Sequence, residues 1–147
     1  MKQEIPNAFI DKRCFFCGDK NEQGLQLKFY QDNDTGEVYT DYLPDKPFSR
    51  QGNILHGGIQ MGLLDEAMGW ASYVSTGEMA VTSELNVKFL APVYLGQKIR
   101  VSCQVTAREG RRIHMQATIR NSEGIVCSSA GGTYRVLPPW EVRGTDS

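Results

Sequence analysis

The element that decides this fold is encoded by residues 56–70, HGGIQMGLLDEAMGW. Apolar residues recur here and just beyond at steps of three and four, which predicts a helix from Gly57 to about Val74 with one broad apolar face. Gly62 and Gly69 lie inside it, and each costs up to ~1 kcal/mol relative to alanine. We therefore expect another part of the molecule, for example a curled sheet, to pack unusually close to this helix.

Segments with strand patterns lie on both sides of the helix. Residues 25–30 alternate apolar and polar side chains, and turn residues at 32–36 lead to a returning strand at 37–43. Beyond Gly77, an antiparallel meander of four long strands with short glycine-containing turns is predicted, over residues 81–90, 98–108, 111–120 and 125–137. One helix with six antiparallel strands is an α+β arrangement. Because one helix cannot cover six strands, the sheet must curl around it or a second subunit must cover the rest, and we expect a dimer.

Length and charge narrow the class of protein. The 147 residues predict a single domain over 1–147, with an irregular N-terminal segment at 1–24 and a short helix near Ala8 to Lys12. A net charge of -1 argues against a nucleic-acid or membrane-surface binder. No signal peptide or run of ~20 apolar residues is found, so we expect a cytoplasmic protein.

The start of the predicted helix carries the first candidate chemistry. Gly57 and Gly58 expose backbone N–H groups at the positive end of the helix dipole, which suits a carbonyl oxygen that gains negative charge. Asp65 and Glu66 follow two turns later, about 100° apart around the helix, so only one of them faces the same groove as His56. From the residues alone, two solvated carboxylates with His56 as an N-cap explain the stretch equally well.

A wider pattern separates these alternatives. His-Gly-Gly, six further residues and Asp65 together resemble the acyl-CoA thioesterases of the hotdog superfamily, in particular the PaaI-like and 4-hydroxybenzoyl-CoA thioesterase branch. Residues 81–93, VTSELNVKFLAPV, are similar to a strand of that branch that contains Thr or Ser and ends in Phe-Leu-x-Pro. Gly96 and residues 132–134 also match, so the resemblance covers about residues 25–137. It implies a hotdog fold, in which a six-stranded antiparallel sheet wraps around one central helix.

The resemblance also implies roles for particular residues. Asp65 occupies the acidic position of the family and would act as nucleophile or as the general base for water. Gly57 would polarise the thioester carbonyl through its N–H, and His56 would orient the substrate or the loop. Thr82 and Ser83 match the strand position that, in the partner subunit, would help to place the carboxylate or the water. Glu66 is the second choice for the catalytic carboxylate.

The loop before the helix departs from the family pattern. Family members often carry Asn or Gln six residues before the histidine, where it helps to hold water. Arg50 stands there in this chain, with Gln51 beside it and Asn53 closer to the helix. Gln51 or Asn53 takes this role through a shifted loop in our interpretation.

Four cysteines do not make a disulfide framework in a chain of this size. Cys14 and Cys17 form a Cys-x-x-Cys pair before Gly18, similar to an N-terminal element of some of these thioesterases. A structural zinc ion needs about four ligands, which two cysteines and two distant histidines do not supply. A redox pair lacks the surrounding βαβ pattern. We therefore interpret this turn as packing over the sheet edge and expect no metal.

Basic residues gather around a predicted turn. Arg108, Arg111 and Arg112 flank Gly110, and Lys88 lies on a nearby predicted strand. Charged hairpin tips are usually only solvated, but arginines at one end of a sheet can bind the phosphates of coenzyme A. Arg111, Arg112 and Lys88 are the candidates for that contact.

The sequence therefore predicts hydrolysis of a small- to medium-chain or aromatic acyl-CoA to the free acid and coenzyme A, without metal or organic cofactor. A non-catalytic acyl-CoA sensor and a hotdog dehydratase or hydratase remain as alternatives. The expected assembly is a homodimer, extended in some cases to a dimer of dimers.

Overall fold

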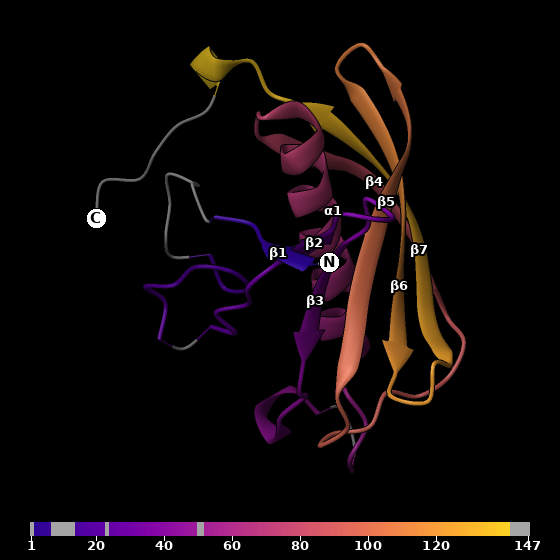
Figure 1. The fold of residues 1–147 in the computed structure, drawn as a ribbon. Helices are drawn as coiled ribbons and strands as arrows, with labels where there is room; N and C mark the ends of the chain where they lie inside the picture. Colours follow the sequence, from indigo (N-terminus) through magenta and orange to yellow (C-terminus); the bar gives the residue numbers. More distant parts are fainter. Residues whose placement is uncertain (1, 7–13, 23, 50–51, 142–147) are drawn as a thin grey trace.

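One long helix lies along the concave side of a curved sheet (Figure 1). The structure is a computed structural model that describes residues 2–6, 14–22, 24–49 and 52–141. The helix, α1, runs from Gly57 to Thr76 and confirms the predicted helix with two further residues at its end. It ends at Gly77, whose φ of 73° is a left-handed conformation that glycine adopts without steric cost.

Within the described residues the sheet contains seven strands, one more than predicted, in the order β1-β2-β3-β5-β6-β7-β4. All of its neighbouring strands are antiparallel. The strands are β1 (Lys2–Glu4), β2 (Tyr30–Asp32), β3 (Val38–Tyr42), β4 (Ala80–Phe89), β5 (Ile99–Glu109), β6 (Arg112–Asn121) and β7 (Val126–Val136), with short 3-10 helices at Lys46–Phe48 and Pro139–Glu141.

The predicted four-strand meander is wrong in one respect. The strands β5, β6 and β7 follow one another, but β4 pairs with β7 at the far edge and not with β5. The connection from β4 to β5 crosses beneath the start of α1, where the Leu55 N–H donates to the Val93 carbonyl at 2.8 Å and Ile54 forms a β-bridge with Tyr94. These contacts carry the chain from one edge of the sheet to its middle.

The first predicted strand is also wrong over most of its length. Only Tyr30 of residues 25–30 belongs to a strand, because the N–H groups of Leu25 and Leu27 donate to the carbonyls of Phe15 and Phe16. The strand β1 lies within the segment that we predicted to be irregular, and the predicted helix near residues 8–12 lies outside the described residues.

The helix packs its apolar face against the inner face of the sheet. Leu63, Leu64, Ala67 and Met68 are fully buried, together with inward-facing residues of β5, β6 and β7. The expected close approach occurs at one of the two helix glycines. A Cβ atom at Gly62 would lie closer than 3.0 Å to the ring of Phe16, so it is the N-terminal segment, not the sheet, that approaches there.

The second helix glycine, Gly69, has no atom outside its own stretch of helix within 4 Å of the position that its Cβ would take.

Among the described residues, no helix is both long enough and apolar enough to cross a membrane.

The outer edge of the sheet is long and open. The strand β4 has ten residues, pairs on one side only with β7, and is exposed over most of its length. Its apolar side chains Val81 and Phe89 are 41% and 52% exposed. An edge of this length normally needs a cover, because its unpaired backbone groups invite pairing with another strand.

Candidate active site

The N-terminus of α1 presents a free backbone donor. The His56 side chain caps the helix, since its Nδ1 accepts a hydrogen bond from the Gly58 N–H at 2.8 Å. Among the described residues, none accepts a hydrogen bond from the Gly57 N–H. A Cβ atom at Gly57 would lie 3.5 Å from the ring of Phe89, so the start of the helix faces the end of β4. The Gly57 N–H stays a predicted oxyanion donor, and His56 caps the helix, as the residues alone suggested.

Two hydroxyl groups hold the side chain of Asp65. The Thr82 hydroxyl donates to Asp65 Oδ1 at 2.6 Å, and the Tyr134 hydroxyl reaches the same oxygen. Tyr134 also reaches the Asp65 backbone carbonyl at 2.8 Å. Burial and the bond to Asp65 raise the pKa of Tyr134, so its hydroxyl keeps the proton that it donates. A carboxylate with two donors on one oxygen has its other oxygen available for a reaction.

The pairing of β4 with β7 brings these hydroxyls together. Thr82 lies directly opposite Tyr134, and paired residues point to the same face of a sheet. A register shift follows between Thr82 and Glu84, which leaves Ser83 without a partner at a bulge. The resemblance implies that Thr82 serves the partner subunit, but in the structure it contacts Asp65 of its own chain, because β4 runs back along α1.

The neighbouring carboxylate, Glu66, points to different surroundings. The Trp70 indole N–H donates to Glu66 Oε1 at 3.2 Å, and the Cys14 thiol donates to the two carboxylate oxygens of Glu66 at 3.7 and 3.8 Å. Burial raises the pKa of Glu66 to about 7. Hence Asp65 faces β4 and β7, whereas Glu66 faces the cysteine turn, as the 100° step between them requires.

The free donor and the held carboxylate lie far apart within one chain. Asp65 follows Gly57 by eight residues, which corresponds to about 12 Å along the helix axis. A nucleophile attacks from about 3–3.5 Å, so Gly57 and Asp65 of the same chain do not reach one thioester carbon together for direct attack.

Of the two residues predicted to hold the water, the structure describes Asn53 but not Gln51. Gln51, like Arg50, lies outside the described residues. Asn53 is exposed and its backbone carbonyl accepts from the Leu95 N–H at 2.7 Å. It lines a cavity of about 760 Å³ next to the loop that precedes α1.

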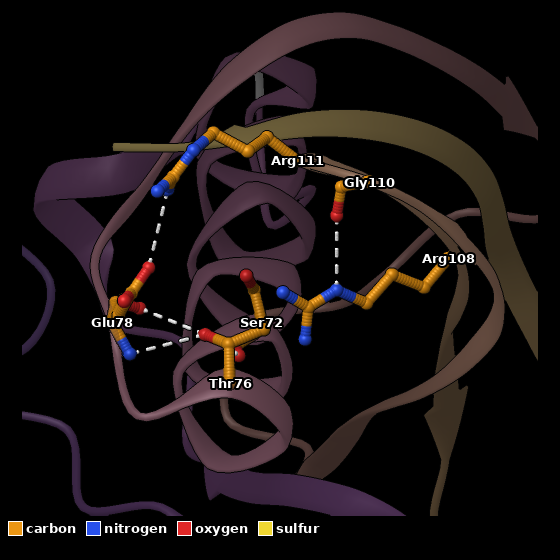
Figure 2. Close-up of polar contacts among 6 residues, drawn as sticks. All are labelled: Ser72, Thr76, Glu78, Arg108, Gly110 and Arg111. Carbon is orange, nitrogen blue, oxygen red and sulfur yellow. Dashed lines mark hydrogen bonds and ion pairs between the residues drawn. The ribbon is translucent and has the colours of Figure 1, made fainter. Parts of the chain in front are cut away.

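The candidate phosphate-binding residues do not form one group. Figure 2 shows Arg108 and Arg111 near the C-terminal end of α1, where Arg111 pairs with Glu78 at 3.4 Å and Arg108 donates to the Gly110 carbonyl at 3.1 Å. Arg112 opens β6 at the same end of the sheet, opposite Arg135.

Lys88 is placed at the other end. It pairs with Ser129, six residues along β7 from Arg135, or about 20 Å for extended chain. Within one chain, Lys88 therefore does not join Arg111 and Arg112, because β4 continues toward the start of α1.

The fold and this arrangement define the class of protein. A helix enclosed by a curved antiparallel sheet is the hotdog fold that the sequence predicted, and a sequence profile of the thioesterase superfamily matches residues 52–128, just over half of the chain. The chain belongs to the thioesterase superfamily.

Individual relatives agree with this family. The bovine (Bos taurus) acyl-coenzyme A thioesterase THEM4 is 25% identical over 126 residues, 85% of this chain and 52% of that protein. The crystal structure of the thioesterase superfamily protein RHA08564 superposes with a TM-score of 0.78 at 22% identity and covers 89% of this chain and 68% of that one. The structure of BH2602 from Bacillus halodurans with CoA has a TM-score of 0.69 at 27% identity and covers 77% and 75%. The chain spans between half and two thirds of the length of the curated relatives it matches.

Proposed function

We propose that this chain hydrolyses a small- to medium-chain or aromatic acyl-CoA to the free acid and coenzyme A. The observation that carries the proposal is the carboxylate of Asp65, which Thr82 and Tyr134 hold beside the open edge of the sheet. The family and the acyl-CoA thioesterase activity of the relative THEM4 support the substrate class, as does the CoA bound to BH2602.

The residues divide the reaction between them. Asp65 attacks the thioester carbon, or removes a proton from the water that attacks it. Negative charge then develops on the carbonyl oxygen, where the Gly57 N–H and the positive end of the helix dipole stabilise it. The carbon–sulfur bond breaks, and coenzyme A leaves as a thiolate that then takes up a proton. Where Asp65 is the nucleophile, water next hydrolyses the acyl–Asp65 anhydride, which releases the free acid and restores the carboxylate. This division needs no metal ion and no organic cofactor.

A homodimer is part of the proposal. The helix rise separates Gly57 from Asp65 by about 12 Å, so each reaction centre uses Gly57 of one subunit and Asp65 of the other. The exposed β4 edge supplies a surface on which two copies can pair antiparallel. A dimer of dimers is a further arrangement, and the molar mass in solution measures both.

Arg111 and Arg112 remain the proposed contacts for the phosphates of coenzyme A, since guanidinium groups bind phosphate through paired N–H donors. The proposed compartment is the cytoplasm.

The test is a panel of acyl-CoA substrates of increasing chain length, with aromatic members, read out as free coenzyme A. Asp65→Asn should lower kcat by about 10²–10⁴-fold, the contribution expected of a general base. Glu123→Gln, at the exposed β6–β7 turn, is the control for loss of a carboxylate away from the site.

Three outcomes would contradict parts of this proposal. If Asp65→Asn hydrolyses at the original rate and Glu66→Gln does not, the catalytic carboxylate is Glu66. If the unmodified protein binds acyl-CoA but releases no thiol from any substrate, it is a sensor. If it instead adds water to an enoyl thioester, it is a hydratase.

A further inference from the structure

A tight turn near the N-terminus presents two thiols in a fixed arrangement. The Gly18 N–H donates to the Cys14 carbonyl at 2.8 Å, which closes the turn that carries Cys14 and Cys17. Backbone N–H groups of Phe16 and Cys17 point at the Cys14 sulfur. The carbonyls of Phe15 and Phe16 accept from Leu25 and Leu27 at 2.7 and 2.8 Å, so the turn is held from outside as well.

A carboxylate from α1 completes this group. Glu66 stands 52 residues from Cys14, yet its Oε1 lies 3.7 Å from the Cys14 sulfur. One ligand atom from each of Cys14, Cys17 and Glu66 lies within 4.8 Å of the others. We call these three residues the thiol–carboxylate cluster. Three acidic groups so close repel one another unless they hold protons or share a cation.

The spacing in the cluster fits a metal ion. Tetrahedral coordination with Zn–S near ~2.3 Å and Zn–O near ~2.1 Å places sulfur and oxygen ligands about 3.6 Å apart. The observed 3.7 Å between the Cys14 sulfur and Glu66 Oε1 is close to this value. The other contacts match the outer partners that metal ligands usually have: the Trp70 indole N–H donates to Glu66, and two backbone N–H groups face the Cys14 sulfur.

The cluster also leaves room for a fourth ligand. Its three residues line a cavity of about 220 Å³, together with Gly69, Trp70 and Met79. One water molecule occupies about 30 Å³ in the liquid, so this space holds water or a small ligand atom next to an ion. The space beside Gly69 is open, since a Cβ at that position would meet no atom within 4 Å outside its own stretch of helix.

We propose that Cys14, Cys17 and Glu66 bind one divalent transition-metal ion, with zinc as the preferred ion and a water in the fourth position. Thiolate sulfur and carboxylate oxygen are both ligands that zinc accepts, and three protein ligands with an open position are an established arrangement. Sequence analysis did not identify Glu66 as a third ligand, because it lies 52 residues from Cys14 and only the folded structure brings the two side chains together. The ion would tie the N-terminal turn to α1 one residue from Asp65.

The test uses the full chain, purified under reducing conditions and freed of metal by a chelator. Titration with Co²⁺ should give one ion per chain, with a sulfur-to-cobalt charge-transfer band and the strong visible d–d bands of four-coordinate cobalt. Zinc should displace the cobalt and abolish both sets of bands. Elemental analysis of protein expressed in zinc-supplemented medium should find one zinc ion per chain.

Variants separate the three ligands. Cys14→Ser and Cys17→Ser should each remove the charge-transfer band, whereas Cys103→Ala, which removes a buried thiol outside the cluster, should keep it. Glu66→Gln should weaken cobalt binding by more than the ~10–100-fold that loss of an outer partner costs, and should change the d–d bands. Circular dichroism and thermal unfolding check that each variant is folded.

Two results would overturn the inference. One is a reduced, folded protein that takes up no more cobalt than the Cys14→Ser/Cys17→Ser double variant. The other is an unchanged cobalt affinity and spectrum in Glu66→Gln. Neither measurement depends on thioester hydrolysis, so this inference and the proposed function fail or succeed separately.

Discussion

Replacing Gly57 with proline would remove the proposed oxyanion donor and little else. Proline lacks the backbone N–H but is favoured at the first position of a helix, which Gly57 occupies. The preceding residue, His56, already has φ -60° and ψ 135°, the extended conformation that a residue before proline prefers. The cap between His56 Nδ1 and the Gly58 N–H does not involve the deleted group.

We expect Gly57→Pro to lower kcat strongly and to leave the free energy of unfolding nearly unchanged. Removing one oxyanion donor costs about 10²–10³-fold in kcat, or roughly 3–4 kcal/mol of transition-state stabilisation. The free energy of unfolding should stay the same or rise by about 0.4–1 kcal/mol, because proline restricts the unfolded chain. Steady-state kinetics with the best acyl-CoA of the panel and chemical denaturation measure the two effects.

Gly57→Ala is the matched control. It keeps the N–H, and its Cβ would meet the Phe89 ring at 3.5 Å, which is an ordinary contact. We expect its kcat to lie within a few-fold of the unmodified value, since no hydrogen bond is lost. Equal losses in both variants would show that shape at Gly57 matters and not the donor. Full activity of Gly57→Pro would refute the assignment of Gly57.

Mixed dimers test whether the site is shared between subunits. A dimer of one Asp65→Asn chain and one Gly57→Pro chain contains one site with both defects and one site with none, if each site takes one residue from each subunit. Random mixing of the two inactive proteins should then restore about a quarter of the unmodified activity. If each chain forms its own site, every site in the mixture carries one defect and no activity returns.

Two further predictions concern stability. Gly62→Ala should lower the free energy of unfolding by about 1–3 kcal/mol, because its Cβ would overlap the Phe16 ring. Gly69→Ala should raise the free energy of unfolding by up to ~1 kcal/mol, because its Cβ has open space and alanine favours the helix. Chemical denaturation of the two variants should therefore give shifts of opposite sign. Arg100 forms two hydrogen bonds with Asp41, at 2.8 and 3.0 Å, which hold the pKa of that carboxyl below its usual range. This stabilisation is present above the ordinary pKa near ~3.9 and is lost as the pH falls through the lowered pKa. Arg100→Gln should therefore raise the Asp41 pKa in an NMR titration and flatten the acid loss of stability, and an unchanged pKa would contradict this assignment.

Local patterns predicted most of the elements but not their order in the sheet. The helix and strands β4 to β7 agree with their predicted bounds to within about two residues, because apolar spacing and turn residues act over short distances. The place of β4 next to β7 depends on how residues 90–98 cross beneath α1. That crossing involves contacts far apart in sequence, which periodicity does not contain.

In the candidate site, too, features that depend on neighbouring residues were predicted, and contacts that depend on strand pairing were not. Helix-end chemistry predicted the donor at Gly57 from neighbouring residues alone. The Tyr134 contact was missed, although the alternation in β7 would have placed its side chain on the inner face. Its meeting with Thr82 and Asp65 also requires the pairing of β4 with β7, which no local pattern supplies.

The two adjacent carboxylates show how one helix turn can serve two kinds of chemistry. Asp65 receives hydroxyl donors at the sheet edge, which fix the orientation of its carboxyl group for the proposed reaction. Glu66 is turned toward an apolar cavity with two thiols, where burial raises its pKa and favours a proton or a metal ion as partner. Helical spacing left the choice between Asp65 and Glu66 open, and these surroundings support our proposal of Asp65 as the catalytic carboxylate. The same 100° step that directs Asp65 to the proposed reaction directs Glu66 to the cysteine turn, so both sites depend on the rotation of α1 within the sheet.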